Sequence, residues 1–349
     1  MKTNFPFIDG EFTSGGLKMR ILVLGGAGYI GSHTSLELIK AGYEVVVADN
    51  LVTGYKSAIP TGAKFYEGDL RDKSFLDRLF TEEKIDAVIH FAAYSLVGES
   101  VTNPLKYYDN NLCGTKVLLD AMVEHRIDKI VFSSTAATYG EPKSIPILED
   151  DPTCPTNPYG ETKLAMEKMF KWTGKAHGMK FVSLRYFNAC GADESGSIGE
   201  AHNPESHLIP LILQVPNGKR EAISIFGTDY DTPDGTCIRD YIHVTDLASA
   251  HILAVEYLLK GGESDVFNLG NGVGYSVREV IESARRITCH PIPAIEVERR
   301  AGDPARLVAS SEKAKKILGW KPTHDSLDEI IESAWNWHKN HPDGYNEVK

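Results

Sequence analysis

A glycine-rich loop near the start of the chain constrains its fold more than any other feature. Residues 25–31 read Gly-Gly-Ala-Gly-Tyr-Ile-Gly. The apolar run 20–24 before them is typical of a buried strand, and residues 32–41 after them have helical spacing that stops at Gly42. In a strand–loop–helix unit of this kind, glycines let backbone N–H groups approach a pyrophosphate at the positive end of the helix. The loop therefore predicts a dinucleotide-binding unit.

An acidic residue indicates which dinucleotide would bind. Asp49 follows the second predicted strand, 44–48, and lies 18 residues after Gly31. A carboxylate at this place accepts hydrogen bonds from the adenosine ribose and repels a 2′-phosphate. We therefore predict NAD as the cofactor. Asp69 and Leu70 follow the third predicted strand and are candidates to contact the adenine, although a solvated loop aspartate fits the spacing nearly as well.

The first half of the chain alternates between strands and helices. Further strands are expected at 64–67, 87–92, 129–133 and 180–185, and helices at 74–83, 115–126 and 158–176. This alternation is typical of βαβ units and predicts an α/β fold with a Rossmann-type doubly wound parallel sheet. After residue 188, loops rich in glycine, proline and aspartate separate shorter elements. These predict a smaller C-terminal α/β substrate domain.

The same pattern divides the chain into three segments. Residues 1–18 lack a hydrophobic period and contain Ser-Gly-Gly near their end, so they are interpreted as a leader or an expression remnant. A native N-terminal extension stays open as the alternative. Residues 19–188 are expected to form the NAD-binding domain and residues 189–349 the substrate domain, some of whose segments can return to the first.

Composition excludes several other classes of protein. The formal net charge is −11, from 37 Lys and Arg against 48 Asp and Glu, which argues against nucleic-acid and membrane-surface partners. No apolar run approaches the ~20 residues that a membrane helix needs. The five cysteines are widely spaced without a C-x-x-C, and the 12 histidines include no H-E-x-x-H. We therefore expect no metal site and a reduced, cytoplasmic protein.

A tyrosine and a lysine on one predicted helix carry the expected chemistry. Tyr159 and Lys163 are four residues apart, so they share a helix face, and Asn157 and Pro158 suit the cap and the first turn. A free phenol titrates near pH 10 and is a poor base at neutral pH. A nearby ammonium and the positive nicotinamide would lower that pKa. We therefore predict that Tyr159 takes and returns an alcohol proton.

Hydroxyl side chains follow the fifth predicted strand. Residues 133–135 read Ser-Ser-Thr, at the carboxyl end of a strand where open α/β sheets bind ligands. Thr135 is the candidate to donate to the substrate oxygen and to share its proton with Tyr159. The alternative is a hydroxyl cluster that satisfies the backbone of the loop.

Several further motifs occur in order along the chain. They lie at 25–33, 49–51, 90–93, 185–188, 234–244 and 299–303. Together with the Tyr–Lys pair, they resemble the UDP-glucose 4-epimerase (UDP-galactose 4-epimerase) family, in the extended branch of the short-chain dehydrogenase/reductase superfamily. The resemblance runs from Met19 to about Tyr345. It implies interconversion of UDP-glucose and UDP-galactose by transient NAD-dependent oxidation at sugar C4, rotation of the 4-keto sugar and return of the hydride.

The resemblance also implies a set of site residues. The catalytic residues would be Thr135, Tyr159 and Lys163, with Tyr159 taking the proton of the sugar 4-hydroxyl. The implied NAD contacts are Gly25, Gly28, Tyr29, Ile30, Gly31, Asp49, Asn50, Asp69, Leu70, Phe91, Ala92, Ala93, Asn110, Ser133, Tyr159, Lys163 and Tyr186. The implied UDP-hexose contacts are Thr135, Asn188, His207, Leu208, Arg239, Arg300, Asp303 and Leu307. The two arginines match the family's diphosphate contacts, a role that suits charge-assisted hydrogen bonds.

Four positions depart from the better-known members of this family. Thr135 stands in place of a serine, and Ser95 replaces a lysine near the cofactor phosphates, which predicts a weaker grip on NAD. His207 replaces an asparagine. Leu307 falls where a tyrosine or a cysteine lines the pocket at sugar C2, and a leucine leaves more room than a tyrosine. We therefore expect that N-acetylated UDP-hexoses are also accepted.

Some related functions fit the sequence less well, and others stay open. A 4,6-dehydratase is disfavoured because Ala136 and Ala137 stand where that family carries an Asp-Glu acid pair. A UDP-glucuronate 4-epimerase, or another NAD-dependent enzyme that modifies sugar nucleotides, stays open. A non-catalytic NAD sensor also stays open, although the retained Tyr–Lys pair argues against it. The family often dimerises through a four-helix contact that includes the Tyr–Lys helix, so a homodimer is expected.

Overall fold

A parallel β-sheet organises the larger part of the molecule. The computed structural model describes residues 13–14, 17–300 and 303–347. Seven parallel strands form the sheet in the order β13-β8-β7-β6-β3-β4-β5. Their bounds are β3 Arg20–Leu24, β4 Glu44–Asp49, β5 Lys64–Glu67, β6 Ala87–His90, β7 Lys129–Ser133, β8 Lys180–Arg185 and β13 Asp265–Asn268. The predicted doubly wound α/β fold is confirmed.

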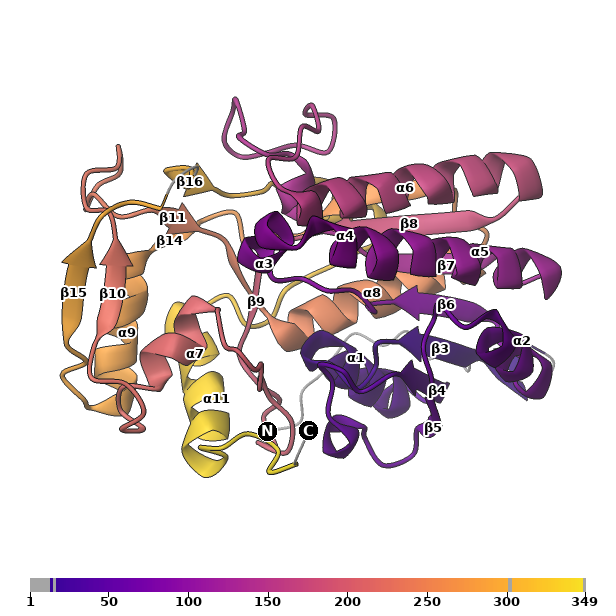
Figure 1. Ribbon diagram of the computed structural model, residues 1–349, viewed down its shortest axis with the longest axis horizontal. Helices are drawn as coiled ribbons and strands as arrows, with labels where there is room; N and C mark the ends of the chain where they lie inside the picture. The colour runs from indigo at the N-terminus through magenta and orange to yellow at the C-terminus, as the bar shows by residue number, and fades with distance from the viewer. Residues whose placement is uncertain (1–12, 15–16, 301–302, 348–349) are drawn as a thin grey trace.

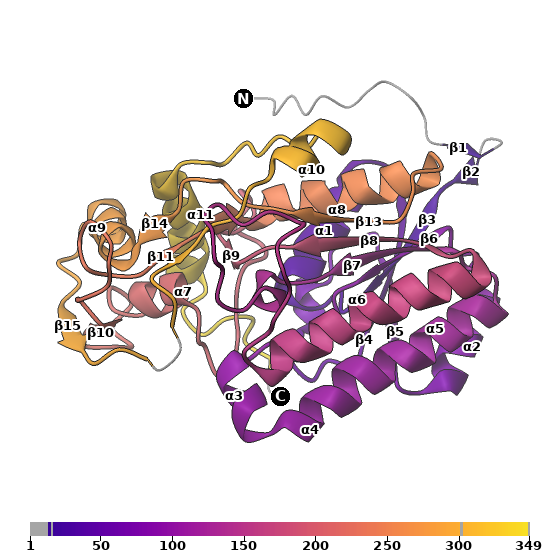
Figure 2. The ribbon, with the colours of Figure 1, turned by 90° about the horizontal axis from the view of Figure 1, so that it is seen from above.

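Helices cover both faces of this sheet. They are α1 Tyr29–Lys40 and α8 Val244–Leu259 on one face, and α2 Lys73–Glu82, α5 Gly114–Glu124 and α6 Pro158–His177 on the other. Figure 2 shows the strands between α8 on one side and α5 and α6 on the other. The bounds of α1, α2, α5 and α6 lie within three residues of the predicted helices, whereas α8 was not predicted.

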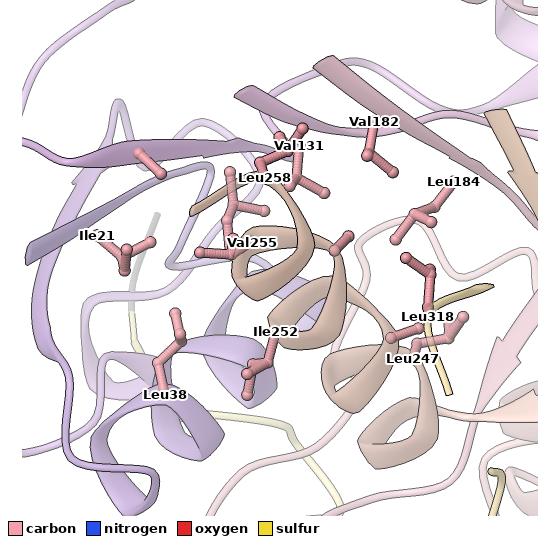
Figure 3. Packing of buried hydrophobic residues seen from close by; sticks show 14 of the residues in the cluster. Ile21, Leu38, Val131, Val182, Leu184, Leu247, Ile252, Val255, Leu258 and Leu318 are labelled. Carbon is pink, nitrogen blue, oxygen red and sulfur yellow. The ribbon is translucent and has the colours of Figure 1, made fainter. Parts of the chain in front are cut away.

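The apolar run of the first strand is explained by its two covered faces. Ile21 and Val23 belong to the cluster under α1 and α8, whereas Leu22 and Leu24 belong to the cluster under α2, α5 and α6. All four are at most 2% exposed. Figure 3 shows the first cluster, in which Leu38 of α1 and the apolar side of α8 face the strands. A parallel sheet buried on both faces requires such continuous runs.

The order of the strands creates the crevice in which ligands of this fold bind. The chain proceeds outward from β3 to β4 and β5, and then returns to β6 on the other side of β3. The connections after β3 and β6 therefore leave the sheet in opposite directions. Open α/β sheets bind ligands at the carboxyl ends of the strands at such a reversal. The glycine loop and residues 91–93 both follow these two strands.

The smaller part of the molecule lies beyond the carboxyl ends of these strands, to the left in Figure 1. Its strands are β10 Ile223–Phe226 with β15 Ala294–Val297, β9 Asn188–Cys190 with β12 Tyr241–His243, and the sheet β14 Tyr275–Ser276, β11 Ile238–Arg239 and β16 Arg306–Leu307. Its helices α7 Leu208–Leu213, α9 Val277–Thr288 and α11 Leu327–Asn340 share a third apolar cluster.

Short elements complete the described chain. They are the 3-10 helices η1 Lys56–Ala58 and η3 Ala136–Thr138, the π-helix η2 Tyr108–Cys113, and the helices α3 Val97–Thr102, α4 Pro104–Tyr107 and α10 Glu312–Ile317. The predicted leader, residues 1–18, lies mostly outside the described residues, and Thr13–Ser14 pairs with Leu17–Lys18 as β1 and β2. Among the described residues, no helix combines the length and the apolar character needed to cross a membrane.

Three late segments return to the first sheet. Helix α8 packs on it, β13 forms its edge beside β8, and residues 314–320 at α10 join the apolar cluster under α8, although all three follow residue 188 in the chain. The division of the chain near residue 188 stays a proposal, and residues 244–268 would then be assigned to the first domain. This return was anticipated only in general terms, because the short strand β13 has no distinguishing pattern.

Candidate active site

The glycine loop has the shape that a dinucleotide requires. Gly25 has a φ of +77°, and a Cβ there would lie 2.6 Å from the backbone nitrogen of Ala92. A Cβ on Gly31 would lie 2.2 Å from the carbonyl oxygen of Gly25. Gly28 is the N-cap residue of α1, and it has no side chain that could accept a hydrogen bond from the first amide groups of the helix. Glycine is needed at both close approaches, and the loop fits a pyrophosphate at the helix N-terminus.

The acidic residues after β4 and β5 belong to an ordered network. The Asp49 carboxylate accepts hydrogen bonds from the backbone N–H of Ala27 (3.0 Å) and of Leu51 (2.8 Å). Asn50 Nδ2 donates to Asp69 Oδ2 (2.9 Å). Hydrogen bonds from the Arg71 guanidinium hold the pKa of Asp69 well below its usual range. Asp69 is therefore not a freely solvated loop residue, and the network ties the glycine loop to the end of the second strand.

The segments after β6 connect the sheet to helix α6. The backbone N–H groups of Phe91 and Ala92 both donate to the carbonyl of Leu24, at 2.9 and 3.1 Å. Asn110 lies in the π-helix and donates to Asn111 Oδ1 (3.0 Å). Asn111 in turn donates to the Thr162 hydroxyl on α6 (3.2 Å). Asn110 thus stands in a hydrogen-bonded chain that reaches the Tyr–Lys helix, and Asn111 also accepts from the backbone N–H of Tyr94 (2.8 Å), directly after residues 91–93.

Helix α6 begins as predicted and brings its lysine to the end of β7. Asn157 caps it by accepting from the Gly160 N–H (2.9 Å). Lys163 is 3% exposed, and its Nζ donates to the carbonyl oxygen of Ser133 (2.8 Å). Nζ lies 5.9 Å from the centroid of the Tyr159 ring. Burial lowers the pKa of Lys163 to about 7, against the nearby charge of Glu167, which raises it.

The pKa of the tyrosine differs from the expectation. We expected Lys163 and the positive nicotinamide of NAD together to lower this pKa. In the chain alone, burial raises the pKa of Tyr159 to about 12, and a hydrogen bond with Thr135 only partly opposes that rise. The loss of water around the phenol therefore outweighs the groups of the chain that favour its ionised form, and the lowering of this pKa with NAD bound stays a prediction.

A buried ion pair below this site was missed by the sequence analysis. Glu167 accepts from Arg185 Nε (2.9 Å) and Nη2 (2.5 Å) and from the Ser134 hydroxyl (2.5 Å). The side chains of the pair are each 7% exposed. Glu167 lies four residues after Lys163 on the same helix, and that spacing was the available signal. Nothing in the sequence shows that this face is buried against Arg185.

The side chains beyond the fifth strand are held from several directions. The hydroxyls of Ser133 and Tyr186 share a hydrogen bond of 2.5 Å. Thr135 caps the short helix η3 by accepting from the Ala137 N–H (3.1 Å). The predicted hydroxyl cluster therefore does satisfy some loop backbone, as its alternative interpretation required. Thr135 is also the hydrogen-bond partner of Tyr159. Its hydroxyl therefore both contacts the tyrosine and satisfies the backbone of the loop.

Three of the implied substrate contacts lie together in the smaller part. Arg239 Nη2 donates to the carboxylate of Asp303. Arg239 on β11 is also the register partner of Leu307 on β16. Leu307 packs against the small cluster of Ala136 and Tyr139, directly beside the threonine that contacts the tyrosine. The end of β16 therefore connects the predicted diphosphate contacts to the predicted catalytic residues.

The other implied substrate contacts are placed separately. Asn188 Nδ2 donates to the carbonyl of Asp240 (3.1 Å). The Arg300 guanidinium lies 3.9 Å above the centroid of the Phe226 ring. The backbone carbonyl of Arg300 accepts a hydrogen bond from the Asp303 N–H (3.3 Å). Leu208 is the first residue of α7. The His207 imidazole points at Glu200, a contact for which the sequence analysis had no expectation.

Comparison with known proteins places these residues in a family. The profile of the NAD dependent epimerase/dehydratase family matches residues 21–270, which is more than half of the chain. The chain belongs to the NAD-dependent epimerase/dehydratase family. The UDP-glucose 4-epimerase of Halalkalibacterium halodurans is 63% identical over 327 residues, which cover 94% of this chain and 98% of that protein.

Solved structures agree with this assignment. A crystal structure of a UDP-glucose 4-epimerase is 58% identical with a TM-score of 0.93, and the match covers 94% of this chain and 100% of that one. The UDP-glucose 4-epimerase of Bifidobacterium longum, solved in complex with NAD+ and UDP, is 43% identical with a TM-score of 0.89 over 94% of this chain and 100% of that one. The expected cofactor and the recognised family are confirmed, while the roles of individual site residues stay predictions.

Proposed function

We propose that this protein interconverts UDP-glucose and UDP-galactose by transient oxidation at C4 of the sugar. The observation that carries the proposal is the Tyr159–Thr135–Lys163 arrangement at the end of β7, in a chain 63% identical to a UDP-glucose 4-epimerase. The glycine loop and Asp49 would hold NAD, with the glycines against the pyrophosphate and the carboxylate at the adenosine ribose. When bound, NAD accepts the hydrogen at C4 as hydride and returns it.

The chain's own side chains would manage the proton at the sugar 4-oxygen. Tyr159 takes and returns it, and Thr135 donates a hydrogen bond to the same oxygen. With a pKa of about 12, the phenol is a weak base in the chain alone, so the site must gain positive charge to ionise it. The Nζ of Lys163 donates a hydrogen bond to the Ser133 carbonyl and lies beside the Tyr159 ring. At a pH near or below the pKa of Lys163, this side chain supplies one positive charge there.

Epimerisation requires a firm hold on the nucleotide and a loose hold on the sugar. Arg239 and Arg300 would hold the diphosphate, and Asp303 orients the first of them. The neighbouring Leu307 offers no polar group to fix the hexose, which favours turning of the 4-keto sugar in the site. Its size also supports acceptance of N-acetylated UDP-hexoses as a second activity.

We also propose a cytoplasmic homodimer. All five cysteines are free, which suits a reducing compartment. Trp172 on α6 is 64% exposed, and it lies beside Leu119 of α5 and Met169 in a shallow depression. An exposed tryptophan between two parallel surface helices supports a helix-to-helix contact between two copies of this chain.

The decisive experiment supplies UDP-galactose to the purified protein without added NAD and measures UDP-glucose by chromatography. Conversion would support both the activity and a retained cofactor. Tyr159→Phe should lose turnover and keep UDP binding, whereas Tyr108→Phe, at an exposed tyrosine, should behave as the wild type. Unchanged turnover in the Tyr159 variant would contradict the proposed proton transfer. A wild type that binds NAD and converts neither UDP-galactose nor UDP-glucuronate would instead favour the NAD sensor.

A further inference from the structure

Four potential metal ligands, among them the predicted substrate contact His207, converge on one point at the edge of the site described above. Glu200, His202, Glu205 and His207 come from a single stretch of eight residues before α7. One ligand atom from each side chain lies within 4.8 Å of all the others. No metal site was expected, since the sequence has neither a C-x-x-C pair nor H-E-x-x-H, but these four residues have the spacing Glu-x-His-x-x-Glu-x-His.

The separations bracket those of a small tetrahedral site. His202 Nδ1 lies 3.0 Å from Glu200 Oε1 and 3.8 Å from Glu205 Oε2. His207 Nδ1 lies 3.9 Å from Glu205 Oε1 and closer still to Glu200 Oε1. With zinc–nitrogen and zinc–oxygen bonds of roughly 2.0–2.1 Å, neighbouring ligand atoms in a tetrahedron lie about 3.4 Å apart. The observed separations lie on both sides of this value, and the 4.8 Å limit of the cluster exceeds it by about 1.4 Å, so side-chain shifts of about 1 Å would admit an ion.

The orientation of the two imidazoles favours a cation over an ion-pair cluster. Both Nδ1 atoms face the same oxygen of Glu200, and the two rings are 5.1 Å apart at 83°. Without a metal, each ring must direct a proton at that one oxygen. If both rings are charged, they also repel each other. A divalent ion replaces the two protons and is neutralised by the two carboxylates, so the donor set and the charge both match.

The surrounding structure holds these ligands in position. Glu200 is 3% exposed, and its carbonyl accepts from Trp337 Nε1 on α11 (3.1 Å). Glu205 Oε1 accepts from the backbone N–H groups of Ser206 (2.7 Å) and His207 (2.9 Å), which leaves Oε2 directed at His202. Hydrogen bonds of this kind orient ligands in known metal sites. The arrangement is therefore built into the loop and does not consist of exposed acidic side chains.

We propose that Glu200, His202, Glu205 and His207 form a structural binding site for a divalent transition metal, and that zinc is the metal that fits it best. All four positions of a tetrahedron are filled by protein, as in structural zinc sites. The ion would join the loop 199–207 to the start of α1, because the His202 ring packs edge-to-face on Tyr29 at 6.1 Å. It would thereby fix the N-terminus of α7 against the glycine loop.

The test uses the full chain without a histidine tag, stripped with a chelator and then titrated with ZnCl2 by calorimetry. We expect one tight equivalent and a higher midpoint of thermal unfolding, because the metal binds only the folded chain. Cobalt in place of zinc should give the intense visible absorption of a tetrahedral site. Binding of cobalt with only the weak spectrum of an octahedral ion would overturn the proposed geometry.

Variants separate this cluster from other zinc ligands, including the exposed cysteines. His207→Gln changes a side chain that is 45% exposed, so the variant should fold, and it should weaken zinc binding by at least about tenfold. Glu205→Gln should do the same. His177→Gln, at the exposed end of α6, is the matched control and should retain the tight equivalent. Equal zinc binding by the wild type and both cluster variants would show that the four residues form an ion-pair network only.

Discussion

Replacing Glu167 with glutamine isolates one charge in the support of the Tyr–Lys helix. The substitution keeps the shape of the side chain and an oxygen that can accept from the Ser134 hydroxyl. It removes the negative partner of Arg185, whose side chain is 7% exposed and lies below the Tyr139 ring. The arginine cannot lose its proton, so the variant must bury an unpaired positive charge.

The expected loss of stability follows from that burial. Removing one partner of a buried ion pair costs about 3–5 kcal/mol, and the retained hydrogen bonds place Glu167→Gln near the lower end. The matched control is Glu124→Gln, whose partner Lys73 is a surface residue and whose own side chain is 57% exposed. An exposed pair contributes less than about 1 kcal/mol. The two variants therefore differ several-fold although each removes one carboxylate.

The assay is urea unfolding followed both by circular dichroism and by tryptophan fluorescence. Coincident transitions would justify a two-state analysis, which a chain of 349 residues does not guarantee. A second readout is the pKa of Lys163, which the Glu167 charge raises and which should therefore fall in the variant. A stability loss below 1 kcal/mol, equal to that of the control, would refute our reasoning about the buried pair.

Three further predictions concern the glycine loop, the sugar pocket and the buried lysine. Gly31→Ala should abolish retention of NAD through purification, measured by the ratio of absorbance at 260 and 280 nm, whereas Gly98→Ala, where a Cβ meets open space, should retain it. Leu307→Tyr should lower turnover of UDP-N-acetylgalactosamine more than that of UDP-galactose; equal losses in chromatographic assays would contradict the size argument. Lys163 has a folded pKa of about 7 against an ordinary 10.5, so its unfolded state binds more protons between these values and stability rises with pH there. Between these two pH values, the free energy of unfolding of the wild type should rise by up to about 1.4 kcal/mol per pH unit relative to that of Lys163→Met. Urea unfolding at several pH values measures this difference.

The sequence was sufficient for most of the sheet because its signals are local. Ile21 to Leu24 had to be apolar on both faces, and the glycines after them had to make close approaches, so both patterns are visible in the sequence alone. The cap at Asn157 and the shared face of Tyr159 and Lys163 are equally local.

What could not be predicted depends on burial and on distant partners. The pKa of Tyr159 depends on how much water the fold removes from around the phenol, and spacing carries no information on that quantity. Glu167 and Arg185 meet across 18 positions of the chain through the packing of α6 on β8. Arg239 and Asp303 are further apart still, and only the register of β11 against β16 brings their segments together.

The return of α8 and β13 to the first sheet determines how this protein can be modified. A chain cut after residue 188 would keep β8 and lose the strand paired with it, leaving Val182 and Leu184 at an open edge and Leu38 of α1 without its neighbour helix. Such a fragment would aggregate. Exchange of sugar specificity between relatives therefore calls for separate grafts that retain residues 244–268 and also residues 312–320, because Ala314, Leu318 and Trp320 belong to the same apolar cluster as α8.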